Sequence, residues 1–211
     1  MTYNPQQISG GTAILDLVES HDTGCAPRLG PELSELVHRQ FPDQETARKE
    51  IRRATLEVLG HCIDPTGTPS QNTGLVTGYV QSGKTLSIAS VVAAAQDNGF
   101  RLIVLIAGSS KILAQQSRDR LLRDLNVLGG ALTRPWRHFH NPTRVDREAI
   151  SACLEGWEGK RSRPKTLLIT LLKRYQHLNN SAEILGGIPP ELLTSALIID
   201  DESDHYSLNN L

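Results

Sequence analysis

The chain has 211 residues, a formal net charge of −1 and 38% hydrophobic residues. This size and composition are typical of one globular domain with a small appendage, and the near-zero charge gives no general argument for nucleic-acid binding. The apolar runs are too short to cross a bilayer, and the amino-terminal residues lack a basic, apolar signal sequence. Three widely spaced cysteines, Cys25, Cys62 and Cys153, form no CxxC pair, which disfavours both a disulfide framework and a zinc ribbon and suits a reducing cytosol. We therefore expect a soluble, cytoplasmic protein that does not enter a membrane.

The first 63 residues predict a helical amino-terminal extension. Residues 10–22 and 31–41 have the composition of short helices with a loop between them. A stronger helix is predicted over 43–62, where Asp43 is placed to cap the amino terminus. Residues 64–74 are rich in Gly, Pro, Thr and Asn, which predicts a loop.

From residue 74 onward, short apolar runs alternate with helical patterns. Strands are predicted over 74–80, 101–108, 166–172 and 196–200, and helices over 84–99, 110–128 and 147–157. The strands are apolar throughout rather than alternating, which is typical of a parallel sheet covered by helices on both faces. We therefore expect an α/β lobe over residues 64–211, with an insert at about 131–164.

One turn in this lobe matches a phosphate-binding motif. Residues 78–85, GYVQSGKT, fit G-x-x-x-x-G-K-[ST] at every fixed position. Glycine lets backbone N–H groups wrap a phosphate, and the following helix points its amino terminus at the anion. Lys84 would reach the β- and γ-phosphates, and the Thr85 hydroxyl would bind Mg²⁺. A chance glycine turn would produce the pattern in roughly one chain of this size in a hundred. The residues expected to bind the nucleotide are Gly78, Gln81, Ser82, Gly83, Lys84 and Thr85.

An acidic cluster at the end of the last predicted strand narrows the chemistry. Asp200, Asp201 and Glu202 follow the apolar run at 196–199. A carboxylate there can hold Mg²⁺, and a neighbouring glutamate can orient and deprotonate the attacking water. The alternative is a solvated acidic turn, which the adjacent phosphate-binding motif disfavours. We therefore predict that Lys84, Asp201 and Glu202 are catalytic, that Thr85 and Asp201 bind the metal, and that the cofactors are ATP and Mg²⁺.

The two motifs together carry a family resemblance. Residues 201–204 have the form D-E-x-D, which resembles the motif of superfamily-two helicases. The pair GYVQSGKT and IIDDESDHYSLN is more closely similar to the amino-terminal ATPase part of Z-one domain proteins, which are bacterial, helicase-like candidate endonucleases of defence-type gene clusters. The resemblance covers about residues 74–209, with Ser203 where alanine is commoner. It implies a RecA-like, three-layer sandwich with a mostly parallel sheet, of which this chain holds one lobe.

The resemblance also implies contact with a nucleic acid, with DNA favoured. Loops at Gly108–Lys111, with Gln115 or Gln116, and at Thr170–Lys173 would touch its backbone. The segment from Arg101 to Arg174 carries fifteen basic and six acidic residues, which suits a phosphate backbone. The alternative interpretation is that these charges are scattered over solvated helix faces.

A helicase-like motor needs a second RecA-like lobe or a partner chain to complete the site. Such a partner supplies an arginine to the γ-phosphate, a contribution on the order of 10³–10⁵ in rate. The sequence stops shortly after D-E-x-D, so we expect a truncated lobe that hydrolyses ATP slowly at best. Two alternatives remain open: another P-loop class such as a small-molecule kinase or a GTPase, although no N-K-x-D motif is present, and a non-catalytic nucleotide- or protein-binding module.

The remaining notable residues predict structure rather than chemistry. His138 and His140 lack a third metal ligand nearby in the sequence, so a surface loop is the favoured interpretation. Trp136 and Trp157 are expected to pack rather than to stack on bases. No D…ExK pattern marks a nuclease centre.

Overall fold

The computed structural model describes residues 6–8, 12–16, 25–67, 71–78, 84–127, 135–156, 165–193 and 195–201. The chain forms two compact units, Met1–Gly99 and Phe100–Leu211. The functional domain boundary predicted at residue 63 stays a prediction.

The first unit combines a small antiparallel sheet with three helices. Its elements are β1 (Gln6–Ile8), β2 (Thr12–Asp16), α1 (Pro31–Gln40), α2 (Glu45–Gly60), β3 (Gly74–Gly78) and α3 (Lys84–Asp97). The strands lie in the order β1-β2-β3, and β2 and β3 pair in full register from Thr12 opposite Gly78 to Asp16 opposite Gly74.

Two expectations for this unit need correction. The helix predicted over 10–22 is wrong in its described part, because Thr12–Asp16 is strand β2. A five-residue run is too short to distinguish the helical period from the alternation of a strand. Its pairing with β3 therefore determines that it is a strand. The strand before the phosphate-binding motif is present as β3, but it pairs antiparallel with β2 and not with the parallel strands of the second unit.

Helix α3 is the central helix of the first unit. It packs against both α1 and α2, and it buries two neighbouring faces at Ala89, Ser90 and Val92–Ala95. Small side chains on several sides of a helix let two other helices approach it closely. The predicted end of this helix is confirmed: α3 ends at Asp97, and Gly99 has φ +91°, the left-handed conformation that favours glycine after a helix.

The end of α3 also caps the start of α1. Asp97 accepts hydrogen bonds from the backbone N–H groups of Glu32 (3.0 Å) and Leu33 (2.9 Å), which have no partner inside their own helix. Burial raises the pKa of the Asp97 carboxyl, and these two N–H groups partly oppose the rise. A Cβ at Gly30 would collide with the Asp97 side chain, so this close approach requires glycine.

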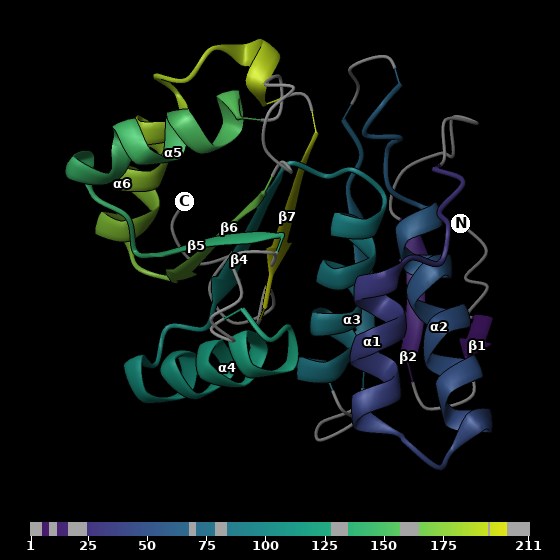
Figure 1. Ribbon diagram of the computed structural model, residues 1–211. Helices are drawn as coiled ribbons and strands as arrows, with labels where there is room; N and C mark the ends of the chain where they lie inside the picture. Colours follow the sequence, from purple (N-terminus) through teal and green to yellow (C-terminus); the bar gives the residue numbers. More distant parts are fainter. Residues whose placement is uncertain are drawn as a thin grey trace. The chain divides into compact units, whose positions relative to one another are not determined.

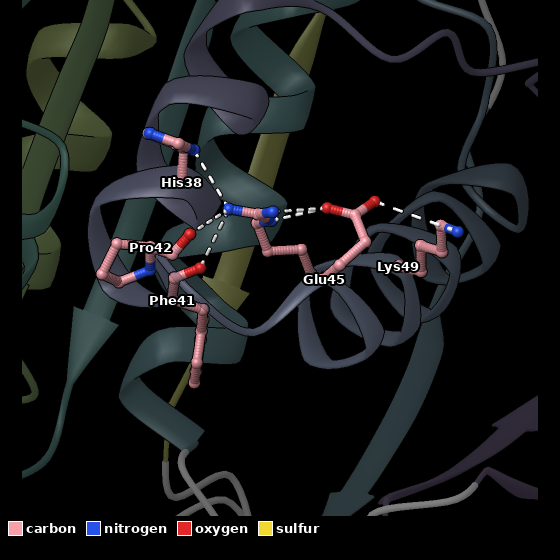
Figure 2. A network of polar contacts seen from close by, with 6 residues as sticks. His38, Phe41, Pro42, Glu45 and Lys49 are labelled. Carbon is pink, nitrogen blue, oxygen red and sulfur yellow. Dashed lines mark hydrogen bonds and ion pairs between the residues drawn. The ribbon is translucent and has the colours of Figure 1, made fainter.

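Arg48 on α2 connects α1, α2 and the turn between them by hydrogen bonds (Figure 2). The Arg48 side chain is 14% exposed and donates to the carbonyls of Phe41 (3.2 Å) and Pro42 (2.6 Å), to Glu45 Oε2, and to His38 Nδ1 (3.2 Å). The guanidinium therefore holds carbonyls of the turn that no helix partner satisfies. The predicted cap by Asp43 is wrong, because Gln44 is the N-cap residue and makes no side-chain cap bond.

The second unit contains a four-stranded sheet, and all of its described strands are parallel. Its elements are β4 (Leu102–Ala107), α4 (Lys111–Asp124), β5 (Trp136–His140), the 3-10 helix η1 (Arg144–Asp146), α5 (Arg147–Glu155), β6 (Thr166–Leu172), α6 (Tyr175–Leu185), the 3-10 helix η2 (Pro190–Leu192) and β7 (Ala196–Asp200). The strand order is β5-β6-β4-β7. The predicted strands at 101–108, 166–172 and 196–200 are confirmed, as is the parallel arrangement of their sheet.

The helices cover both faces of this sheet, as the apolar strands predict (Figure 1). The chain moves across the sheet in one direction from β4 to β5 and in the opposite direction from β5 to β6 and on to β7. Because parallel crossovers are right-handed, opposite directions place their helices on opposite faces. Accordingly, α4 packs on one face against Ala107 and Leu172, and α5 and α6 cover the main core on the other.

The expected insert contributes a strand to the sheet. Residues 136–140, expected to lie in an insert, form β5 and pair with β6. The favoured interpretation of His138 and His140 as a surface loop is therefore wrong. The sequence WRHFH has no apolar run, so it does not predict a strand. Its mixed polarity fits the position of β5, which is an edge strand among the described strands and is only half covered. Trp136 is 4% exposed, which confirms its packing role, whereas Trp157 lies outside the described residues.

Among the helices of the described residues, none is both long and apolar enough to span a membrane.

Candidate functional site

The phosphate-binding motif lies between a strand and a helix. Strand β3 ends at Gly78 and α3 begins at Lys84, which is exposed, while Thr85 is half-buried. A strand before the motif and a helix after it are the structural context that the motif requires. Gln81, Ser82 and Gly83 lie outside the described residues.

The helix that follows the motif has a buried body and an accessible start. Its buried residues begin at Ala89, whereas Lys84 at the first position is exposed. The first backbone N–H groups of an α-helix have no partner within the helix, and they carry the positive end of its dipole. The start of α3 therefore has the electrostatic character that an anion needs, next to a lysine.

Asp201 lies at the carboxyl edge of the second unit's sheet. Its backbone N–H donates to the carbonyl of Ile106 at 2.9 Å, which extends the pairing between β7 and β4 by one residue. The predicted position of this residue at a strand end is confirmed. Glu202 lies outside the described residues. Lys84 belongs to the first unit and Asp201 to the second.

Asp200, the neighbour of Asp201, forms an ion pair that sequence reasoning missed. Lys173 Nζ lies 3.0 Å from both carboxylate oxygens of Asp200, and the two side chains are 10% and 31% exposed. Lys173 follows β6 and Asp200 ends β7, so the pair spans the end of β4, which lies between those strands. The available signal was a lysine and an aspartate at the carboxyl ends of two parallel strands, but the strand order was needed to pair them.

The two loops expected to touch a nucleic acid lie side by side. The N–H of Lys173 donates to the carbonyl of Ala107 at 3.1 Å, so the residues after β4 and after β6 are adjacent. Helix α4 leaves β4 toward one face and α6 leaves β6 toward the other. This is a topological switch point, the position at which open α/β sheets bind ligands. Gly108–Lys111 and Lys173 therefore occupy a favourable place for a ligand.

The two histidines of β5 bind a buried threonine. Thr170 on β6 is 1% exposed, and its Oγ1 lies 2.9 Å from His138 Nε2 and 3.0 Å from His140 Nδ1. His140 Nδ1 also lies 3.2 Å from the Thr170 carbonyl, which only accepts, so this nitrogen carries the proton. Asn141 Nδ2 can then donate to His140 Nε2 (3.1 Å), because Asn141 Oδ1 already accepts from the N–H of Leu172.

Burial and nearby positive charge favour the neutral form of both imidazoles. Burial, followed by the charges of His140 and Arg118, lowers the pKa of His138 to about 4. Burial and Arg118 also lower the pKa of His140, with a small opposing effect of its bond to Thr170. The pair is therefore structural in character, and it joins β5 to β6 beneath α4.

The basic residues that the structure describes in helix α4 and in the η1–α5 segment lie on opposite faces of the second unit's sheet. Helix α4 carries Lys111, Arg118, Arg120 and Arg123 on one side of the sheet, whereas Arg144 and Arg147 start the η1–α5 segment on the other. Several have partners: Arg118 pairs with Asp119, Arg144 with Glu183, and Arg147 donates to the carbonyl of Gly187. Arg134, Lys160, Arg161 and Arg163 lie outside the described residues.

The residues predicted to bind Mg²⁺ have suitable chemistry. Thr85 supplies a hydroxyl and Asp201 a carboxylate, and hard cations such as Mg²⁺ prefer oxygen ligands. In the part of the chain that the structure describes, no group of three or more His, Cys, Asp or Glu side chains could hold a metal. One carboxylate together with substrate phosphates is a usual Mg²⁺ environment, so each residue by itself has donor chemistry that fits Mg²⁺.

Comparison with models of known families, with curated proteins and with solved structures found no match.

Proposed function

We propose that this chain is the nucleotide-binding lobe of a helicase-like, nucleic-acid-dependent ATPase with RecA-like architecture. One observation carries the proposal: the complete G-x-x-x-x-G-K-T motif follows a strand and opens α3 with Lys84 at its first position. Asp201 at the carboxyl edge of a parallel sheet supports the same function. The resemblance of both motifs to Z-one domain proteins suggests a place in a candidate endonuclease of a bacterial defence system.

Each predicted residue has a role in this proposal. The backbone of residues 78–83 wraps the phosphates, and Lys84 contacts the β- and γ-phosphates. Thr85 and Asp201 hold Mg²⁺, which supplies charge neutralisation during phosphoryl transfer. Glu202 orients the attacking water and accepts its proton.

The ion pair of Lys173 and Asp200 has a supporting role. Lys173 neutralises Asp200, so the two adjacent aspartates do not repel each other as two uncompensated charges. The ion pair links the end of β7 to the end of β6, with the end of β4 between them, and so positions the backbone of Asp201. Lys173 is therefore a positioning residue, and its replacement is expected to weaken the Mg²⁺ dependence of ATP binding more than ATP binding without metal.

Calorimetric titration with ATP and Mg²⁺ tests the proposal. The Lys84→Ala variant is expected to lose roughly 10- to 100-fold in affinity, since a charge-assisted contact to phosphate disappears. Lys49→Ala is the matched control, because Lys49 is a 73% exposed lysine on α2 of the same unit. Asp201→Asn should keep ATP binding in EDTA and lose the gain that Mg²⁺ gives. A folded wild type that binds no ATP, or a Lys84→Ala variant that binds as the wild type does, would overturn the proposal.

A second assay addresses the nucleic acid. ATP hydrolysis is measured with and without single- and double-stranded DNA, with RNA of the same length in parallel. Stimulation by DNA is the expected outcome. Binding of ATP with no response to any nucleic acid would limit the function to nucleotide binding.

A further inference from the structure

The fold brings two cysteines together that the sequence keeps 37 positions apart. Cys25 lies ahead of α1, and Cys62 lies two residues after the end of α2. The backbone N–H of Cys25 donates to the carbonyl of Cys62 at 2.9 Å. This bond brings the backbones of the two residues into direct contact, although the N–H of Cys62 donates to Leu59 and not back to Cys25. Disulfides span Cα separations of about 4.4–6.8 Å, a range that two residues joined by one backbone hydrogen bond can occupy.

The Cys25 side chain also lies close enough to Cys62 to affect its pKa. Burial is the main cause that raises the pKa of Cys62 to about 11, and the Cys25 thiol is the second cause. Burial and the charge of Asp64 raise the pKa of Cys25. Both groups are therefore thiols at neutral pH, and Cys62 Sγ donates to the carbonyl of Val58 at 3.7 Å. Cys25 is the less enclosed of the two, so a reagent meets it first.

We propose that Cys25 and Cys62 form an intramolecular disulfide under oxidising conditions, with a low-molecular-weight disulfide such as oxidised glutathione as the oxidant. The Cys25 thiol loses its proton and attacks one glutathione sulfur, which releases one glutathione thiolate. The Cys62 thiolate then attacks the Cys25 sulfur and releases the second. Two protein thiols are oxidised, one reagent disulfide is reduced to two thiols, and the two protons pass to the released glutathione.

The disulfide would close the part of the chain that contains α1 and α2. These helices pack on α3, and Arg48 already ties them to each other. Asn72 Nδ2 donates to the carbonyl of His61 at 2.7 Å, so the residues just before β3 lie beside the end of α2. The bond would therefore fix both ends of the α1–α2 hairpin and stabilise the first unit. This inference does not depend on the proposed function.

Thiol counting and peptide mapping of the full chain test the inference. The folded protein is incubated with oxidised or reduced glutathione at pH 7 and pH 9. Accessible thiols are then counted in the folded protein, and total thiols are counted after denaturation. Wild type treated with oxidised glutathione should lose two of its three thiols, faster at pH 9 because more thiolate is present. A digest without reductant should contain a peptide that links Cys25 to Cys62.

Variants of each cysteine separate the proposed bond from other oxidation. Cys153, a half-buried cysteine on α5 of the second unit, is the matched control: Cys153→Ser should form the same linked peptide and retain no thiol. Cys62→Ser should give no internal disulfide and instead accumulate a glutathione adduct at Cys25, whereas Cys25→Ser should give neither the disulfide nor that adduct. Oxidised wild type should melt roughly 10 °C higher than reduced wild type, a difference that both variants lose.

Three results would overturn the inference. The first is a linked peptide that contains Cys153, and the second is a disulfide that joins two chains. The third is the absence of the Cys25–Cys62 link in folded protein at pH 9, together with its formation in urea. That result would show that the folded chain holds the two sulfurs apart.

Discussion

Helices α3 and α4 have the same length and the same first residue, yet they occupy opposite kinds of environment. Each runs for 14 residues, begins with a lysine and follows a strand. Between its terminal Lys84 and Asp97, α3 has no charged residue and is largely buried. Helix α4 carries charges along its length, and it exposes Ile112 (70%) and Leu113 (55%).

The difference shows what a phosphate-binding helix needs. Only α3 follows a G-x-x-x-x-G-K-T motif, and its small, apolar residues make it the core of its unit. A helix held on several sides keeps its first N–H groups in fixed positions, which is what electrostatic binding of an anion requires. Helix α4 packs on one face of a sheet and leaves the rest of its surface to solvent. Its lysine, Lys111, starts a surface helix without the glycine turn.

If α3 is core and α4 is surface, a charge placed in each should have very different consequences. Val92→Asp in α3 buries an unpaired carboxylate at a position that is 0% exposed, and it should cost on the order of 4 kcal/mol or abolish folding. Leu113→Asp in α4 should change stability by at most about 0.5 kcal/mol. Urea unfolding followed by circular dichroism measures both. Equal costs would mean that α3 is not the buried helix.

The residues beneath α4 predict a loss of stability in acid. The pKa of His138 is about 4 when folded, below its ordinary value of 6.5, so the unfolded chain binds the proton first. The contribution of His138 to the free energy of unfolding is fully present above pH 6.5 and is lost as the pH falls toward 4. The loss is about 2 kcal/mol after an allowance for partial exposure.

A His138→Gln variant isolates this effect, because an amide can still bond to Thr170 and does not titrate in this range. Its free energy of unfolding should change less between pH 7 and pH 4.5 than that of the wild type. If the two profiles are parallel, His138 is not held neutral by the fold.

The starts of α1 and α4 differ in how they are capped. Asp97 accepts two backbone N–H groups of α1, whereas Ser110, the N-cap residue of α4, makes no side-chain cap bond. Asp97→Ala should therefore cost about 1–2 kcal/mol, and Ser110→Ala close to nothing. Thermal or urea unfolding of both variants checks the difference. A larger cost at Ser110 would contradict the described cap.

Much of the second unit could be predicted from its sequence. Runs such as TLLITLL contain no charged residue and no alternation of polar and apolar positions, which is typical of a strand covered on both faces, and β6 is buried throughout. Strand β5 was not predicted, because WRHFH has mixed polarity and its histidines find hydrogen-bond partners only after folding, above all Thr170 of another strand. The strand at 12–16 was mistaken for a helix for a similar reason: pairing with β3, not its own pattern, defines it.

The candidate site was predictable where the chemistry is local. A glycine-lysine-threonine turn carries its own spacing rule, so Lys84 could be placed at a helix start before the helix was seen. Contacts between distant residues carry no such rule. The ion pair of Lys173 and Asp200 depends on strand order, and the approach of Cys25 to Cys62 depends on the packing of a helical hairpin.

Hydrogen–deuterium exchange of the full chain, with and without ATP and Mg²⁺, tests the central claim most directly. We predict that the nucleotide slows exchange of the backbone amides at residues 78–86, which include the start of α3, and leaves those at the start of α4 unchanged. The Lys84→Ala variant should show no such protection. Protection at the start of α4 instead, or no change at residues 78–86 under conditions in which ATP binds, would contradict the assignment of the phosphate site to this turn.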